Sequence, residues 1–472
     1  MKSENQQKQA SEAGAGQTRV LAQFASELRF EDIPQEVVQR MKTSVLDSIG
    51  CCLYGVTLPW TQHVSDMVEQ DGAKPVVSIW GTSRRTSLSN AVLVNSTAGH
   101  AFELDDIHKE SIIHAGSIAT PVVLGFAQQS GVASGKDILT AMVAGYEIGA
   151  RAGNAATMDL FFRGFHPQGT SGVFVAAACA AKMMALDATG TQHALGIAGS
   201  QAGGLMAAQE GAMVKRFHSG RAAQSGVYSA LLAARGFTGI EDVLEAPYGG
   251  YLSSYSGKPD YSRLLDGLGQ QWETAKVGYK PHACVTSIHC ALDAFAHILS
   301  THQIRPQQIQ KVSVGVSQMT HTHCAWDYRA QGVTAAQMNL YYGLAVTALD
   351  GMAFVAQYDQ KRIADPEIMR FIQKVDAYVD PEIDALGAAF RHAARVRVEL
   401  TDGRSVFHEI LNRRGSPENP LSHDDVVYKF KNIVGGLITL STIDDYLRLT
   451  DSLDQTATLE PLLDLLSRAL KQ

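Results

Sequence analysis

The first half of the chain repeats apolar residues at the spacing of amphipathic helices. A helix is predicted after Asp32-Ile33-Pro34, because proline suits the first helical turn and Val37, Val45 and Ile49 then fall on one face. Further helices are predicted in segments rich in alanine and glycine, at 90–101, 117–127, 138–150, 172–186, 191–203 and 221–234. Small side chains let helices approach closely, and no strand alternates with these helices, so the pattern predicts a compact helical bundle.

The pattern changes after about residue 270. Residues 311–317 alternate polar and apolar side chains, as a half-buried strand does. Two such runs flank Asp402-Gly403 within 395–410, which predicts a β-hairpin. Helical segments lie between these strands, at 284–299 and 335–348. This region therefore reads as a separate α+β domain.

Helical periodicity returns near the end of the chain, in 424–431, 443–449 and 459–470. The predicted fold class is mainly α, with a large all-helical domain completed by the C-terminal segment and a smaller α+β lid domain. A chain of 472 residues is also too long for one ordinary core. The predicted limits are a disordered tail at 1–17, the helical domain at 18–270 and 415–472, and the lid at 271–414.

Composition narrows the class of protein. A net charge of −7 without a basic domain argues against nucleic-acid binding. The longest apolar stretch, 171–186, contains Lys182 and is too short to cross a bilayer, and the N-terminus has no secretion signal, so no membrane partner is expected. The six cysteines show no CxxC and no paired spacing, which favours a reducing, cytoplasmic location.

The stretch AFELDDIHKESIIHAG, at 101–116, carries the strongest chemical signal. It places several ionisable residues between apolar flanks, among them Glu103, Asp106, His108 and His114. Burying such groups is costly unless they are paired, and clusters of this kind are where proteins shift pKa values for acid–base work. A solvated loop with capping residues is the alternative interpretation.

Three more segments place protic groups in small-residue surroundings. His166 precedes a helix whose free N–H groups favour an anion, although the segment also suits a capping loop. Lys215 and Arg216 lie between glycines and open the helix from Arg221, an arrangement that suits carboxylates but also a solvated basic turn. His282 and His289 face either a cleft between domains or the core.

Several reaction classes lose support. The chain has no GxSxG elbow, no GxxxxGK[ST] phosphate loop and no dinucleotide fingerprint after a strand. His321-Thr322-His323-Cys324 matches no standard zinc spacing, so no metal is predicted. The remaining acids, histidines and cations suit proton transfer on a small polycarboxylate.

The same segments resemble the MmgE/PrpD family over essentially the whole chain after the tail. The matching motifs are Glu103-Leu104-Asp105-Asp106 with His108 and His114, GAMVKR at 211–216, Tyr248-Gly249-Gly250, His323-Cys324-Ala325-Trp326 and Ala336-Gln337-Met338. The resemblance implies a helical domain completed by the C-terminal end, an α+β lid, a homodimer and no cofactor. Motif details look closest to the fungal cis-aconitate decarboxylases of this family.

The resemblance also implies roles for individual residues. His114 matches a histidine near the carbon to be protonated, and Asp106 matches the second acid of the family's pair. His166 and Lys215 match positions that bind substrate carboxylates, and His289 matches a lid histidine. We therefore expect His114, Asp106, Lys215 and His166 to be catalytic, and the substrate to be bound by Glu103, Arg216, His108, His289 and His282.

The expected activity is a cofactor-independent lyase on a small unsaturated polycarboxylate, with cis-aconitate decarboxylation to itaconate and CO₂ as first choice. A hydro-lyase resembling 2-methylcitrate dehydratase, or an isomerase or epimerase of a related acid, is the alternative on the same scaffold. A non-catalytic carboxylate-binding protein is a third possibility. Relative to mammalian decarboxylases, this chain has Ile107 in place of a threonine and one extra residue before His114.

Overall fold

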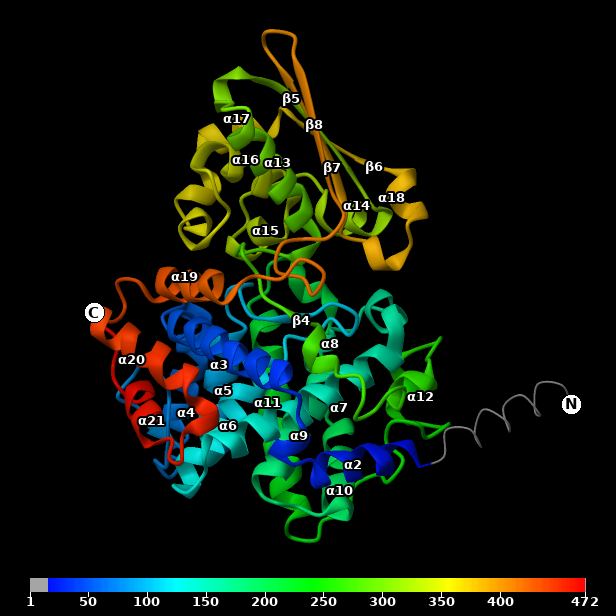
Figure 1. Cartoon of the computed structure of the whole chain (residues 1–472), viewed down its shortest axis with the longest axis vertical. Coiled ribbons are helices and arrows are strands. Elements are labelled where there is room, and N and C mark those ends of the chain that lie inside the picture. Colours follow the sequence, from blue (N-terminus) through cyan, green and yellow to red (C-terminus); the bar gives the residue numbers. More distant parts are fainter. Residues whose placement is uncertain (1–15, 472) are drawn as a thin grey trace, which may run out of the picture.

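The computed structural model describes residues 16–471 of the chain. Figure 1 shows two parts stacked along the long axis, a larger helical part and a smaller part that contains the main sheet. The fold is mainly α with a smaller α+β part, which confirms the predicted fold class. The predicted tail at 1–17 lies outside the described residues except for Gly16 and Gln17, and Gln17 already begins a helix.

The helical part is built from long helices, most of them at the positions that the periodicity predicted, whereas α4 was not predicted. They are α2 (Gln17–Glu27), α3 (Gln35–Gly55), α4 (Pro59–Gln70), α5 (Leu88–Gly99), α6 (Gly116–Ser130), α7 (Gly135–Phe162), α9 (Gly172–Met183), α10 (Ala188–Gly199) and α11 (Val214–Ala233), with short α8 (Pro167–Thr170) and α12 (Tyr251–Tyr255). Between α4 and α5, the two-residue strands β1 (Val77–Ser78) and β2 (Arg85–Thr86) form an antiparallel pair. The helix α9 packs against α6, α7, α10 and α11 and lies at the centre of the bundle.

Close helix approach explains the small residues. A Cβ on Gly149 of α7 would lie 2.2 Å from Cγ2 of Val175, and one on Gly226 of α11 would lie 2.3 Å from Cβ of Ala176. Gly220 plays the same part inside α11, where a Cβ would meet Thr97 of α5 at 2.2 Å. The expected helix start at Arg221 is therefore wrong: Gly220 packs within the helix, which begins at Val214.

The α+β part contains a four-stranded sheet in the order β6-β5-β7-β8. Its strands are β5 (Ile309–Val316), β6 (Val375–Val379), β7 (Ala394–Leu400) and β8 (Ser405–Ile410). The predicted hairpin is confirmed, with Gly403 at φ 87° in the turn between β7 and β8. Strand β6, which pairs in parallel with β5, was not predicted. The helices are α13 (His289–Thr301), α14 (Gln318–Cys324), α15 (Val333–Met338), α16 (Leu340–Asp350), α17 (Pro366–Ile372) and α18 (Pro381–Ala385), and α13 packs on β7 and β8.

The last three helices return to the helical part, as predicted. They are α19 (His423–Val434), α20 (Leu440–Asp451) and α21 (Glu460–Leu466). The first two pack on α3 and the third on α6, so the C-terminal helices lie beside helices from the first third of the chain (Figure 1). Buried Lys429 of α19 pairs with Asp47 of α3 at 2.6 Å and donates to the carbonyl of Leu104. The limits of 271 and 414 for the lid remain a prediction.

Two further observations bear on location and on the site. None of the helices at 16–471 is long and apolar enough to cross a bilayer. The strand β3 (Ile107–His108), inside the charged stretch, pairs antiparallel with β4 (Val277–Gly278), which leads into the α+β part. The charged stretch therefore lies where the two parts meet.

Candidate active site

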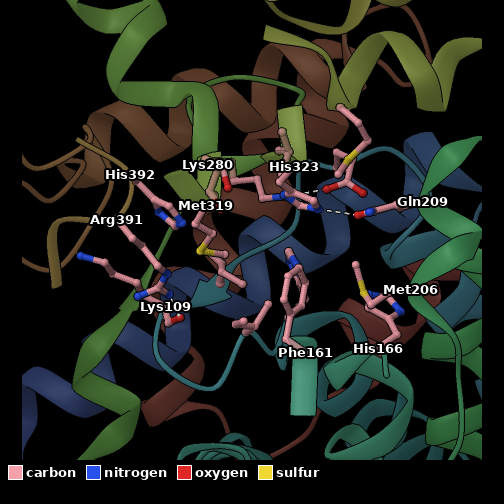
Figure 2. A pocket seen from close by; sticks show the side chains of 18 of the residues that line it. Lys109, Phe161, His166, Met206, Gln209, Lys280, Met319, His323, Arg391 and His392 are labelled. Carbon is pink, nitrogen blue, oxygen red and sulfur yellow. Dashed lines mark hydrogen bonds and ion pairs between the residues drawn. The ribbon is translucent and has the colours of Figure 1, made fainter. Parts of the chain in front are cut away.

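A cavity lies between the helical part and the α+β part, and residues of both line it. The helical part contributes Glu103, Ile107, Lys109, Ile112, His114, Phe161, His166, Met206, Gln209 and Lys215. The remaining lining residues are Lys280, Val285, Thr286, Ser287, Met319, His323, Met338, Arg391, His392 and Arg413. Figure 2 shows histidines, lysines and an arginine around apolar Met319 and Phe161.

The loop between α5 and α6 is fixed by its own side chains. Asp106 accepts hydrogen bonds from the backbone N–H of Gly116 at 2.9 Å, at the start of α6, and from the Tyr146 hydroxyl at 2.7 Å. One ring nitrogen of His108 lies 2.8 Å from the Ser111 hydroxyl, and the other lies 3.0 Å from Glu273. These bonds hold the charged stretch as an ordered, buried loop. It is not the solvated loop of the alternative interpretation.

Glu103, which belongs to this loop, forms ion pairs with three cations. Its carboxylate pairs with Lys215, with Arg216 at 2.6 Å and with Lys280 at 3.1 Å. Burial acts to raise the pKa of Glu103, but the three cations outweigh burial and hold that pKa well below its usual value. The backbone of Glu103 has a φ of 56°, an uncommon conformation for a residue other than glycine, and such strain concentrates at functional sites.

Asp105 holds two histidines. Its Oδ2 lies 2.7 Å from Nδ1 of His100, and its Oδ1 lies 3.2 Å from Nδ1 of His114. Gln168 fixes the His114 backbone from both sides, because it accepts from the N–H at 2.9 Å and donates to the carbonyl at 3.1 Å. Among the described residues, no group bonds to Nε2 of His114, so that nitrogen is available to a ligand in the cavity.

His166 and Lys215 line the cavity near this pair. Nδ1 of His166 lies 2.8 Å from Nδ1 of His218, so one of the two rings donates to the other. Burial, together with nearby Lys215, lowers the pKa of His166 well below its usual value, which makes its ring neutral at pH 7. Burial, opposed by Glu103, lowers the pKa of Lys215 to about 8.

Four of the nine residues predicted from the sequence line the cavity: Glu103, His114, His166 and Lys215. The other five do not line it. Arg216 binds Glu103 and Gln337 behind the cavity, and the carboxylate that contacts histidines is that of Asp105, whereas Asp106 bonds to Gly116 and Tyr146. His108 pairs with Glu273, His282 with Asp293, and His289 bonds to the carbonyl of Cys284.

Sequence reasoning missed several cations of the site. Lys280 belongs to the segment before His282 and was passed over, although a lysine between an aromatic residue and a proline near the domain boundary was a signal. Arg391 and His392 precede β7, and Arg413 follows β8. The hairpin brings these two ends together, so no local spacing revealed them.

One group in the site has the composition of a metal centre. Possible ligand atoms of His100, Asp105 and His114 lie within 4.8 Å of one another. However, Nδ1 of His100 is hydrogen-bonded to one oxygen of the carboxylate, and Nδ1 of His114 lies within ion-pair distance of the other oxygen. This geometry fits proton handling more directly than a metal ion between the three residues.

This buried set of acids, histidines and lysines, at the junction of a helical and an α+β part, defines an enzyme-like site on a two-part scaffold. Two family models match the chain, the MmgE/PrpD N-terminal domain over residues 19–264 and the MmgE/PrpD C-terminal domain over residues 282–454. The chain belongs to the MmgE/PrpD family.

Its relatives carry one recurrent name. The chain is 31% identical to the cis-aconitate decarboxylase of Aspergillus terreus over 98% of both chains. It is 31% identical to the cis-aconitate decarboxylase-like protein oryM of Aspergillus oryzae, over 96% of this chain and 98% of the relative. Human cis-aconitate decarboxylase is 27% identical over 90% of this chain and 89% of its own length.

Proposed function

We propose that this protein decarboxylates cis-aconitate to itaconate with its own side chains and without a cofactor. The observation that carries the proposal is the free Nε2 of His114 in a cavity that also contains Lys215 and Lys280. The site thus combines a proton donor with cations for carboxylates, and relatives that match nearly the whole chain are named cis-aconitate decarboxylases.

The reaction needs stabilised negative charge and one proton. When the bond to one carboxylate breaks, CO₂ leaves and the electron pair is delocalised through the double bond onto a neighbouring carboxylate. Lys215 and Lys280 stabilise that charge, and both side chains are buried, which strengthens their effect. Protonation at carbon then gives itaconate, a dicarboxylate.

His114 is the proposed proton donor, acting through Nε2. Imidazole is the side chain that most often serves as a general acid near neutral pH. Asp105 is a positioning residue in this scheme, since its carboxylate faces Nδ1 and stabilises the imidazolium before transfer. His166 is neutral and suited to a hydrogen bond with a substrate carboxylate. Asp106 supports the loop and is not assigned a proton-transfer step.

The deciding experiment is proton NMR of the purified protein with cis-aconitate, trans-aconitate and 2-methylcitrate in separate samples, with released CO₂ trapped. Itaconate signals together with CO₂ from cis-aconitate are expected, and activity should survive dialysis against a chelator. Water addition or isomerisation without CO₂ would instead make the protein a hydro-lyase or isomerase, because the same cations and histidine suit those reactions. Binding without turnover would indicate a carboxylate-binding protein.

We also propose that the protein is a homodimer, an expectation that rests on the family resemblance. Sedimentation velocity at micromolar concentration should give a mass near twice that of the chain, 50.8 kDa. A monomer at that concentration would contradict the proposal.

A further inference from the structure

A second group of basic residues, of which the lysine and the two arginines are charged at pH 7, lines the cavity away from His114. Lys109, Arg391, His392 and Arg413 all contribute to the wall, and we call them the Arg391 cluster. Figure 2 shows Lys109, Arg391 and His392 gathered on one side, and His166, His323 and Gln209 on the other, with Met319 and Phe161 between. Polar side chains therefore lie on both sides of Met319 and Phe161, and Lys280 lies beside Met319 between them.

The charges of this cluster lack acidic partners. No carboxylate among residues 16–471 lies within ion-pair distance of Arg391 or Arg413. Lys109 is 3.9 Å from Glu418, whose side chain is 48% exposed and therefore well solvated. By contrast, the cations at the other end share the buried carboxylate of Glu103.

Several hydrogen-bond donors in the cluster are also unused. Arg413 is only 3% exposed, yet its Nε and Nη2 have no hydrogen-bond partner. The Nε of Arg391 and the Nδ1 of His392 are likewise buried without a partner among the described residues. The remaining guanidinium nitrogens bind backbone carbonyls, such as those of Ala388 and Tyr279, which carry no full charge.

Such an arrangement is unfavourable in an empty cavity. Burying a cation without a counter-charge costs free energy, and each unpaired buried donor adds to that cost. Burial lowers the pKa of Arg413 to about 10, which still leaves the guanidinium charged at neutral pH. An anion in the cavity would supply the missing counter-charge, and arginine is well suited to bind a carboxylate.

We propose that the Arg391 cluster is a second carboxylate subsite, which selects a polycarboxylate long enough to reach it from the His114 end. The inference rests on the proposed function for the class of ligand and not for the reaction. The apolar side chains of Met319 and Phe161 then face the carbon skeleton between the charged groups. The cavity thereby selects the length and the charge of the substrate, because it binds carboxylates at two separated positions.

The test is calorimetric binding of propane-1,2,3-tricarboxylate, an unreactive tricarboxylate, to the full-length protein. Arg413→Gln and Lys109→Gln should each raise the dissociation constant of the tricarboxylate at least about tenfold, because each removes a charged donor to a carboxylate. Arg404→Gln is the matched control, since Arg404 is a solvated arginine in the β7–β8 turn region and its side chain is 61% exposed. Its affinity should stay within twofold of the original protein.

The melting temperature without ligand separates binding from a structural role. Removal of an unpaired buried charge in Arg413→Gln should leave that temperature unchanged or raise it, whereas loss of a structural guanidinium would lower it. Lys109→Gln keeps the test decisive if Arg413→Gln fails to fold. Affinity within twofold in both variants, or no tricarboxylate binding by the original protein, overturns the subsite. Because binding is measured without turnover, a failure of CO₂ release would refute the proposed reaction alone.

Discussion

In the candidate active site, Nδ1 of His114 lies 3.2 Å from Oδ1 of Asp105, and the other oxygen of this carboxylate faces His100. One buried carboxylate thus lies against two imidazoles and is hydrogen-bonded to that of His100. Burial acts to raise the pKa of Asp105, but the two histidines outweigh burial and hold that pKa well below its usual value. Asp105 therefore remains a carboxylate across the working pH range.

Asp105→Asn should lower kcat at least about tenfold and change KM less than threefold, because Asp105 acts on His114 without lining the cavity. Steady-state kinetics between pH 5 and 9 test this expectation. An effect on KM alone would contradict the positioning role.

His114→Ala should reduce CO₂ release from cis-aconitate at least about a hundredfold, since general acid catalysis contributes on the order of 10²–10⁴ in rate. The fold should persist, because the space left by the imidazole ring only enlarges the existing cavity. His302→Ala is a matched control, as His302 is exposed at the end of α13. Unchanged turnover in His114→Ala would remove this residue from the mechanism.

KM should rise as the pH passes about 8. Burial lowers the pKa of Lys215 to that value against the opposing effect of Glu103, so the ammonium that binds a substrate carboxylate is lost above it. Lys215→Arg keeps its charge over this range, and its KM should stay flat between pH 7 and 9 even if it is higher throughout. A KM that is independent of pH in the original protein would contradict the assignment.

Asp106 should make the protein less stable as the pH rises from about 4 to about 7. Burial raises the pKa of Asp106 to about 7 from the usual 3.8, so between these values the folded state binds a proton that the unfolded chain has lost. Stability falls with pH wherever the folded state binds more protons. At 1.36 kcal/mol per pKa unit, the contribution is at most about 4 kcal/mol.

Asp106→Asn tests this contribution, because the amide cannot ionise and still offers an oxygen to the backbone N–H of Gly116. The melting temperature of each protein is measured at pH 5 and at pH 8. The difference between the two values should be smaller for the variant than for the original protein. An equal pH dependence in both proteins would show that Asp106 does not supply it.

Local pattern was enough for most of the fold. The helices of the first half and the β7–β8 hairpin were predicted because their signals, apolar spacing and an Asp402-Gly403 turn, lie within the segment itself. Strand β6 was missed because its partner β5 lies about 60 residues earlier in the chain, and pairing over such a separation leaves no local mark. The start of α11 was misplaced because glycine at 220 serves helix packing and does not end the helix.

The residues of the candidate site were likewise predicted where the signal is local and missed where it is not. Glu103 and His114 were found because charge is dense in one short stretch, and Lys215 because a basic pair stands among glycines. The choice between Asp105 and Asp106 needed the direction of each side chain, which adjacent identical residues do not reveal. Arg391 and Arg413 come from the two ends of a hairpin and converge only in the folded chain.

The bond from Lys429 to the carbonyl of Leu104 has a consequence for biosynthesis. Leu104 stands between Glu103 and Asp105, so one of the last helices to leave the ribosome supports the backbone of the charged stretch. A nascent chain whose residues up to the start of α19 have left the ribosome contains every proposed catalytic residue. It still lacks this support. Folding of the charged stretch should therefore depend on α19, although this helix contributes no residue to the cavity wall.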